Sequence, residues 1–159
     1  MEKETAYFAA GCFWGVQYRF DQIPGVVETE VGYMGGDLPN PTYAQVCSGT
    51  TGHAETVKVV FDPQQLDYAY LLDQFFRMHD PTQLNRQGPD IGSQYRSAIF
   101  YTSTLQKTLA EQAITHWSQR FSRPIVTQLC PADDYPFWPA EAAHQKYFAR
   151  RGIRGGCHG

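Results

Sequence analysis

The chain has 159 residues, enough for one domain with a substantial core, and 13 Lys and Arg stand against 16 Asp and Glu for a net charge of −3. That balance argues against nucleic acid and anionic membranes as main partners, because both require clustered positive charge. No apolar run approaches the roughly 20 residues of a membrane span, and the opening residues lack the apolar stretch of a signal peptide. We therefore expect a single domain over residues 1–159, cytoplasmic and monomeric.

The first predicted elements are a strand followed at once by a helix. Residues 4–11, ETAYFAAG, are rich in aromatic and small side chains and predict a short strand. The next segment, CFWGVQYRF, predicts a helix whose first turn begins near Cys12. Residues 26–33 and 55–61 alternate apolar and polar side chains, which is the two-residue period of strands. The chain therefore begins in the order β-α-β-β.

The next predicted elements are two helices with a strand between them. Residues 66–78 predict a helix with an apolar stripe and Asp67 as its N-cap. Residues 94–102 predict a strand. A helix is then expected over residues 104–117, with one apolar face made of Leu105, Leu109, Ala113 and Trp117.

The order of the elements predicts the fold class. A strand over residues 124–130 and a short closing helix over residues 140–151 complete the series, which is that of a ferredoxin-like (split βαβ) core with additions. We therefore expect an α+β two-layer sandwich. Residues 34–52 and 79–93 match no regular element. Their aromatic, Gly, Pro and amide content favours long coil segments that are packed and functional.

The chain has four cysteines, at positions 12, 47, 130 and 157. They are too few and too scattered for a disulfide framework, and no C-x-x-C pair is present, so we expect no metal site. Cys47 falls in a loop and Cys130 ends an apolar strand, which favours a bystander role for both. The glycines around Cys157 predict a flexible tail over about residues 150–159, which suits either an unimportant thiol or a resolving cysteine.

Cys12 stands where a strand, a glycine and a helix N-terminus meet. This setting places a thiol near unpaired backbone N–H groups and the positive end of the helix dipole. Such positions lower a thiol pKa from ~8.5 into the range of ~3.5–7.5. Gly11 and Gly15 leave the sulfur sterically open. The setting favours a nucleophile, and the alternative is a cysteine that packs as a small buried hydrophobic residue.

Glu55 and Tyr33 are predicted to point into the core. Glu55 shares the strand face of Val57 and Val59, and Tyr33 shares the face of Val27 and Val31 on its own strand. A partly desolvated carboxyl group has a raised pKa and can donate a proton at neutral pH. The alternatives are a strand-end carboxylate that turns to water and a tyrosine that only packs, with its hydroxyl satisfied.

Five segments together resemble the A-type peptide methionine sulfoxide reductases. They occur in order over nearly the whole chain, and they are GCFWG (11–15), GYMGG (32–36), CSGTTGHAE (47–55), HDPTQLNRQGPDIGSQYRS (79–97) and AEAAHQKY (140–147). The resemblance implies a two-layer α+β core wrapped by long coils, in agreement with the predicted elements. It also implies an oxidoreductase that repairs oxidised methionine in proteins and reduces free methionine sulfoxide, acting on the S epimer.

The resemblance implies a role for each matched residue at the reaction centre. Cys12 would attack the sulfoxide sulfur, and Glu55 would protonate the departing oxygen. Tyr33 and Tyr95 would donate hydrogen bonds to that oxygen. A sulfoxide is a poor electrophile until its oxygen is protonated, so the chemistry needs an acid beside the thiolate.

The matched residues also imply a binding pocket. Phe13 and Trp14 would form an apolar pocket for the methyl group of the substrate. Asp90 would belong to the polar network around the site. No bound cofactor is implied.

Recycling is implied to run through a disulfide. Reduction leaves Cys12 as a sulfenic acid, which Cys157 would convert to a disulfide, and thioredoxin (or dithiothreitol in vitro) would reduce it. Many members carry two recycling cysteines in the tail, whereas this chain has one there. A part for Cys47 or Cys130 in recycling stays open.

Three other classes of protein fit the sequence less well. A thiol peroxidase would also need an activated cysteine, but it has little use for the Phe13–Trp14 pair. A thioredoxin-like oxidoreductase would show C-x-x-C, which is absent. A non-enzymatic interaction module would explain the 14% aromatic content but not the combination of Cys12 with a core-facing Glu55.

Overall fold

The structure is a computed structural model that describes residues 2–152, so Cys157 and most of the predicted tail lie outside the described part. Six strands form one sheet in the order β7-β6-β1-β3-β2-β8. Their bounds are β1 (Glu4–Ala10), β2 (Val26–Met34), β3 (Ala54–Phe61), β6 (Ser97–Tyr101), β7 (Gln128–Pro131) and β8 (Trp138–Pro139). The long helices are α1 (Phe13–Asp21), α3 (Tyr68–Arg77) and α4 (Thr104–Ser118).

The inner strands confirm the predicted fold class. Strands β6, β1, β3 and β2 pair antiparallel, and α1 and α3 make the two crossovers of a split βαβ core. Helix α4 then leads to β7, which runs parallel to β6 at the edge of the sheet. The protein is an α+β fold, as predicted.

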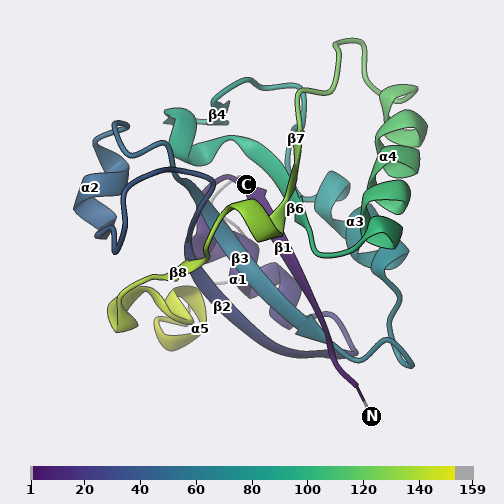
Figure 1. The fold of residues 1–159 in the computed structure, drawn as a ribbon, viewed down its shortest axis with the longest axis horizontal. Coiled ribbons are helices and arrows are strands. Elements are labelled where there is room, and N and C mark those ends of the chain that lie inside the picture. Colours follow the sequence, from purple (N-terminus) through teal and green to yellow (C-terminus); the bar gives the residue numbers. More distant parts are fainter. Residues whose placement is uncertain (1, 153–159) are drawn as a thin grey trace.

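The two faces of the sheet are covered differently. Side chains of α1 and α3, Phe13, Phe20 and Phe75 among them, pack with one face of the sheet in the main hydrophobic cluster. The opposite face carries a smaller cluster around Phe100, against which Tyr135 packs. In Figure 1, α1 lies behind the sheet and the segment leading from β7 to β8 crosses in front of it.

The start of β2 departs from the predicted alternation. The pairing of β2 with β3 shifts between Val26 and Glu28, which marks a β-bulge. Val27 therefore does not share the inner face of Val31 and Tyr33, and its side chain is 54% exposed. Val31 and Tyr33, beyond the bulge, are fully buried as predicted.

Helix α4 begins at the predicted residue and extends one residue further than predicted, but it buries a different face. Leu105, predicted to face the core, is 66% exposed, whereas Gln106 and Ala110 are buried together with Trp117. The Gln106 side chain donates to the Thr5 carbonyl and accepts from the Thr102 amide. These bonds attach the first turn of the helix to the sheet, so a polar residue takes the inner position.

The segments predicted as long coils contain short regular elements. The first holds α2 (Tyr43–Cys47), which begins with a capping box formed by Thr42 and Gln45. The second holds a hairpin of β4 (Arg86–Gln87) and β5 (Asp90–Ile91). A 3₁₀ turn, η1 (Ser93–Tyr95), follows, so the predicted strand over residues 94–102 begins only at β6.

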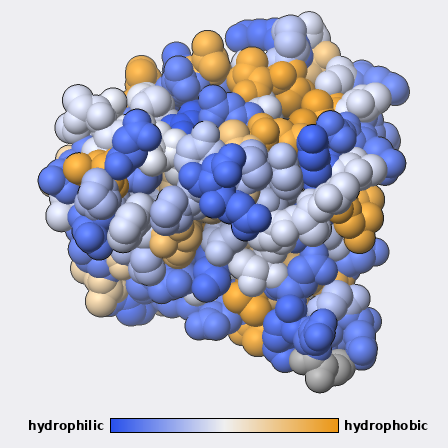
Figure 2. Space-filling view, viewed as in Figure 1, coloured by the Kyte–Doolittle hydropathy of each residue, from blue (hydrophilic) through white to orange (hydrophobic). Residues whose placement is uncertain are grey.

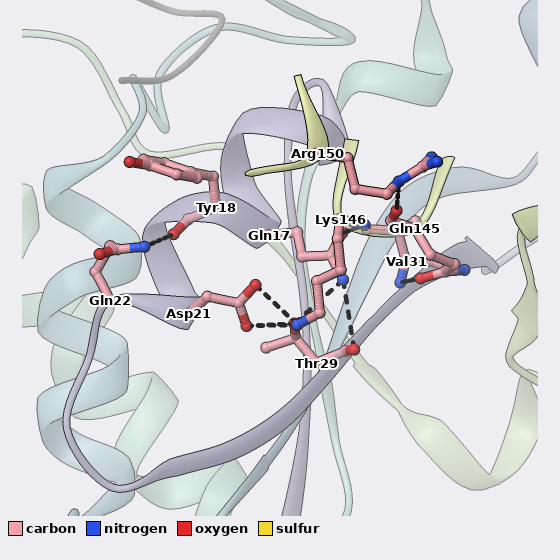
Figure 3. Close-up of polar contacts among 9 residues, drawn as sticks. All are labelled: Gln17, Tyr18, Asp21, Gln22, Thr29, Val31, Gln145, Lys146 and Arg150. Atoms are coloured by element: carbon pink, nitrogen blue, oxygen red, sulfur yellow. Dashed lines mark hydrogen bonds and ion pairs between the residues drawn. The ribbon is translucent and has the colours of Figure 1, made fainter. Parts of the chain in front are cut away.

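The predicted closing helix over residues 140–151 is wrong. The chain instead forms a 3₁₀ turn, η3 (Ala142–His144), and a single helical turn, α5 (Tyr147–Arg150). Lys146 between them has φ +56°, which ends any continuous helix. The Gln145 side chain accepts from the Val31 amide and donates to the Val31 carbonyl, so the segment is tied to β2 instead (Figure 3). The last predicted strand is also shorter and consists of β7 alone.

The surface is mainly polar on the face seen in Figure 2, where hydrophobic side chains occupy separate areas among hydrophilic ones. Within residues 2–152, no helix combines the length and the apolar character needed to cross a membrane.

Candidate active site

Cys12 is the N-cap residue of α1, as predicted from the sequence. Its carbonyl accepts the first hydrogen bond of the helix, from the Val16 amide. Gly11 has φ +101°, a backbone conformation that glycine adopts without strain, and it turns the chain from β1 into the helix. Cys12 is 8% exposed and stands at the positive end of the helix, where a thiolate is stabilised.

Glu55 lies directly beside this helix end. The residue is 1% exposed at the start of β3, so the alternative in which its side chain turns to water does not hold. Glu55 Oε1 accepts a hydrogen bond of 3.1 Å from the amide of Phe13, the residue that follows Cys12. The Glu55 carboxyl group therefore caps the N-terminus of α1, the helix end at which Cys12 lies, although Glu55 follows Cys12 by 43 positions in the chain.

Tyr33 lies next to Glu55, but its hydroxyl has another partner. The two residues are paired across β2 and β3, and the Tyr33 ring packs on Phe13. Its hydroxyl donates to Glu141 Oε1 over 2.9 Å. Burial raises the pKa of Tyr33, and its bond to Glu141 raises it further. The role predicted for Tyr33 on the sulfoxide oxygen stays a prediction.

Tyr43 is a site residue that the sequence analysis did not select. Burial raises the pKa of Tyr43 and of Tyr95, and the nearby charge of Glu55 raises both further, so both hydroxyls remain protonated donors at neutral pH. Asp90 and Cys12 also interact with Tyr95. Tyr43 and Tyr95 thus both interact electrostatically with Glu55, and the role expected of Asp90 in the polar network stays a prediction.

A sequence signal for Tyr43 was available. The segment TYAQ has a threonine and a glutamine at the spacing of a capping box, and Tyr43 is the first helical residue after the cap. The Tyr43 amide donates to Glu141 Oε2, which fixes the start of α2. Burial raises the pKa of Glu141, but hydrogen bonds from the Tyr43 amide, its own amide and the Tyr33 hydroxyl, together with the charge of His144, outweigh burial, and the net pKa is lowered.

Cys47, predicted to be a bystander, lies within this cluster of residues. Partial desolvation raises the pKa of its thiol, and the hydroxyls of Tyr43 and Tyr95 act against that increase. The Gln94 side chain donates to the Cys47 carbonyl. Cys130 is instead on β7, where it packs with the hydrophobic cluster of the opposite sheet face.

An aromatic wall stands at the helix end. Trp14 stacks on Tyr147 with 4.0 Å between ring centroids, and Tyr43 stacks on His144 at 4.3 Å. The Trp14 indole donates to His144 Nδ1 over 3.0 Å. Burial lowers the pKa of His144, which favours the neutral ring that this bond requires. Phe13 is fully buried beneath the wall, so Trp14 is the more accessible of the two predicted pocket residues.

A polar clamp holds the wall in place. The Lys146 ammonium pairs with the Asp21 carboxylate at 2.8 Å and donates to the Thr29 hydroxyl, while the Lys146 amide donates to the Gln17 side chain (Figure 3). Together with the Gln145 bonds to β2, these contacts join the segment of His144 and Tyr147 to α1 and β2. Within residues 2–152, no three His, Cys, Asp or Glu side chains are arranged to hold a metal ion.

Comparison with known proteins identifies the family. Residues 4–158 match the family model described as peptide methionine sulfoxide reductase. The chain belongs to this family. The reductase is 55% identical over 151 residues to the peptide methionine sulfoxide reductase MsrA of Methanoculleus marisnigri, covering 94% of this chain and 91% of that protein.

Solved structures agree with the family. Methionine sulfoxide reductase A of Corynebacterium diphtheriae superposes with a TM-score of 0.92 and 37% identity, covering 98% of this chain and 78% of that one. Mxr1 of Saccharomyces cerevisiae in reduced form gives a TM-score of 0.90 and 33% identity, over 98% and 90% of the two chains. Mxr1 has also been solved in complex with Trx2. The reductase is thus an oxidoreductase of the MsrA type, as the sequence segments predicted.

Proposed function

We propose that the enzyme reduces methionine S-sulfoxide, in proteins and as the free amino acid, through a sulfenic acid on Cys12. The observation that carries the proposal is the hydrogen bond between the Phe13 amide and Glu55, which sets an acid at the helix end where the nucleophile lies. A thiolate and a proton donor at one place are what sulfoxide reduction requires.

The proposed first step transfers oxygen from the substrate to the enzyme. The Cys12 thiolate attacks the sulfoxide sulfur while Glu55 gives a proton to the oxygen. The attack forms a sulfur–sulfur bond between Cys12 and the substrate. That bond and the sulfur–oxygen bond of the substrate then break as the protonated oxygen becomes bonded to the Cys12 sulfur, which leaves Cys12 as the sulfenic acid and the substrate as a thioether. Sulfur of the substrate is reduced by two electrons and sulfur of Cys12 is oxidised by two.

We assign the hydrogen bonds to the sulfoxide oxygen to Tyr43 and Tyr95. Both hydroxyls lie around Glu55, whereas the Tyr33 hydroxyl is bonded to Glu141. Tyr43 then takes the part that the sequence analysis expected of Tyr33. The Trp14 face supplies the apolar surface for the substrate methyl group, with Phe13 supporting it from below.

Recycling is proposed to run through Cys157 and a thioredoxin. Cys157 condenses with the sulfenic acid, releasing water and forming a disulfide, and an outside dithiol reduces that disulfide. The family member Mxr1 forms a complex with Trx2, which supports a thioredoxin as the reductant. Cys47 interacts with Tyr95, as Cys12 does, so a test of Cys157 must include Cys47.

A chemical assay of both epimers tests the proposal. With dithiothreitol as reductant, the protein should reduce the S epimer of methionine sulfoxide and leave the R epimer unchanged. Cys12→Ser should lose the activity, because a hydroxyl without an activating base is a poor nucleophile at neutral pH. Cys130→Ser is the matched control and should keep it. Equal reduction of both epimers, or an active Cys12→Ser protein, would refute the proposed chemistry.

A further inference from the structure

A second pocket lies across the sheet from the reaction site. It has a volume of about 530 Å³ and includes Phe100, Cys130 and Tyr135 in its lining. These side chains belong to the hydrophobic cluster on the face opposite α1, whereas Val57, on the same strand face as Glu55, belongs to the cluster that α1 covers. The pocket is therefore separate from the site of sulfoxide reduction, and its volume is typical of small-molecule sites.

Arg96 is the charged side chain in the lining of this pocket. It is 9% exposed, and its guanidinium donates from Nε to Gln128 Oε1 (2.9 Å) and from Nη1 to the Ser93 carbonyl (3.0 Å). Both acceptors are neutral. These bonds orient the guanidinium and leave the N–H groups of Nη2 for a further acceptor.

In the part of the chain that the structure describes, no carboxylate forms an ion pair with the buried Arg96. Within residues 2–152 the ion pairs are Arg77–Asp73 and Lys146–Asp21, and no Asp or Glu lines the pocket. Burial lowers the pKa of Arg96, and the interactions with Cys130 and Tyr135 partly offset this decrease by raising the pKa. A buried cation without an anion is costly, so the pocket favours an anionic ligand.

The walls restrict what kind of anion fits. Gly35 has φ +93°, and a Cβ there would come within 2.8 Å of Arg96 Nη2 and 2.9 Å of the Phe100 ring. A side chain at this position would collide with both groups, so glycine here leaves the space beside Nη2 unfilled. Leu129 and the edge-on pair of Phe100 and Tyr135 supply apolar and aromatic surface beside it.

We propose that this pocket binds a small organic monocarboxylate with an aromatic or branched aliphatic body, its carboxylate on Arg96 and its body against Phe100 and Leu129. A planar guanidinium matches the two oxygens of a carboxylate. Arg96 is the one cation among the described residues that line the pocket, so these residues balance a single negative charge but not the second charge of a phosphate dianion. This inference is independent of the proposed reaction.

Alkylation of Cys130 gives a direct readout of binding. Cys130 lines the pocket, so a bound ligand should slow its reaction with iodoacetamide, measured by mass spectrometry on the full chain. We expect benzoate to slow this reaction saturably, benzamide to have no effect, and inorganic phosphate to be weaker than benzoate. The exposed Cys47 is the internal control, and its rate should not change.

Two arginine variants separate the pocket from general charge effects. Arg96→Gln should weaken benzoate binding by about tenfold or more, the loss expected for a charge-assisted hydrogen bond. Arg123→Gln, which removes an exposed arginine outside the pocket, should bind as the parent does. No saturable benzoate effect, equal protection by benzamide, stronger protection by phosphate, or unchanged binding in Arg96→Gln would each overturn the proposal. If Arg96→Gln does not fold, the three ligands on the parent protein still decide.

Discussion

The Glu55 carboxyl group has a structural role and a proposed catalytic role. Its Oε1 caps the first amide of α1, and the group is proposed to deliver the proton to the sulfoxide oxygen. The cap holds the acid in one place, since a carboxyl group bonded to a helix N-terminus has little freedom to turn away. The acid is thus positioned by the same hydrogen bond that caps the first turn of α1.

Replacing Glu55 by glutamine removes the proton and keeps the shape. The glutamine oxygen can still accept from the Phe13 amide, so α1 should begin at the same residue. Positioned acid catalysis contributes ~10²–10⁴-fold, and a loss of that size is expected in the single-turnover rate. Glu28→Gln, an exposed position on β2, is the control. A Glu55→Gln rate within a few-fold of the parent would assign the acid to another group.

Two Tyr→Phe variants decide which hydroxyl serves the reaction. Tyr43→Phe removes a proposed donor to the sulfoxide oxygen, and we expect the single-turnover rate to fall by roughly 10–100-fold, the value of a hydrogen bond to a developing charge. Tyr33→Phe removes the bond to Glu141 and should affect the rate less. The reverse order of the two effects would restore Tyr33 to the role expected from the sequence.

At the scale of elements, the segment of η3 and α5 carries the aromatic wall. This segment has few helical turns of its own and is held by hydrogen bonds to α1 and β2. Lys146 donates most of these hydrogen bonds. The stacking of His144 and Tyr147 on Trp14 therefore depends on contacts distant from the site. A change at Lys146 should act on substrate binding without touching Cys12.

Lys146→Ala tests this dependence. The variant removes the bonds to Asp21 and Thr29 and leaves an alanine in a left-handed backbone conformation. We expect KM for methionine sulfoxide to rise and kcat to change little, with a loss of roughly 1–2 kcal/mol of stability after allowing for the partial exposure of the pair. Lys3→Ala, at an exposed position, is the control. Unchanged KM with lowered stability would show that the wall does not contact substrate.

Local sequence patterns predicted the core helices and strands, because the residues of each element that face the core recur at the regular spacing of a helix or a strand. The alternation in β3 and the Asp67 cap of α3 are both present in the structure. The closing helix could not be predicted correctly, because its fate depends on Gln145 and Lys146 reaching β2 and α1, contacts that span more than 100 residues.

The same contrast between local signals and long-range contacts applies to the residues of the site. Cys12 and Glu55 were found because the glycine setting and the strand parity are local signals. Tyr43 was missed because it lies on the short helix α2, whose start is fixed by a hydrogen bond from the Tyr43 amide to Glu141, far away in the chain. A search for capping boxes within the coil segments would have marked its position.

At the scale of the whole molecule, the described chain ends close to the aromatic wall. Helix α5 stacks Tyr147 on Trp14, and five residues lead from Gly152 to Cys157. Five residues span at most ~17 Å. The proposed resolving role of Cys157 therefore requires Cys12 to lie within about that distance of Gly152.

Cys157→Ser should divide the catalytic cycle. The first reduction should proceed at near the parent rate, because Cys157 has no part in attacking the sulfoxide. Thioredoxin-driven turnover should collapse, and a sulfenate-specific reagent should trap Cys12. Dithiothreitol should rescue part of the turnover by attacking the sulfenate directly. Cys47→Ser is the matched variant, and full thioredoxin turnover in Cys157→Ser that is lost in the double variant would assign resolution to Cys47.

The chain divides into two functional parts shortly after the segment that Lys146 anchors. Everything proposed to recognise and reduce a sulfoxide is anchored on the N-terminal side of Gly152, and the proposed resolving thiol follows it. With thioredoxin as the only reductant, a single proteolytic cut after Gly152 is therefore expected to leave an enzyme that consumes one sulfoxide and stops. Such a cut would turn a catalyst into a stoichiometric scavenger, with each molecule spent after one methionine.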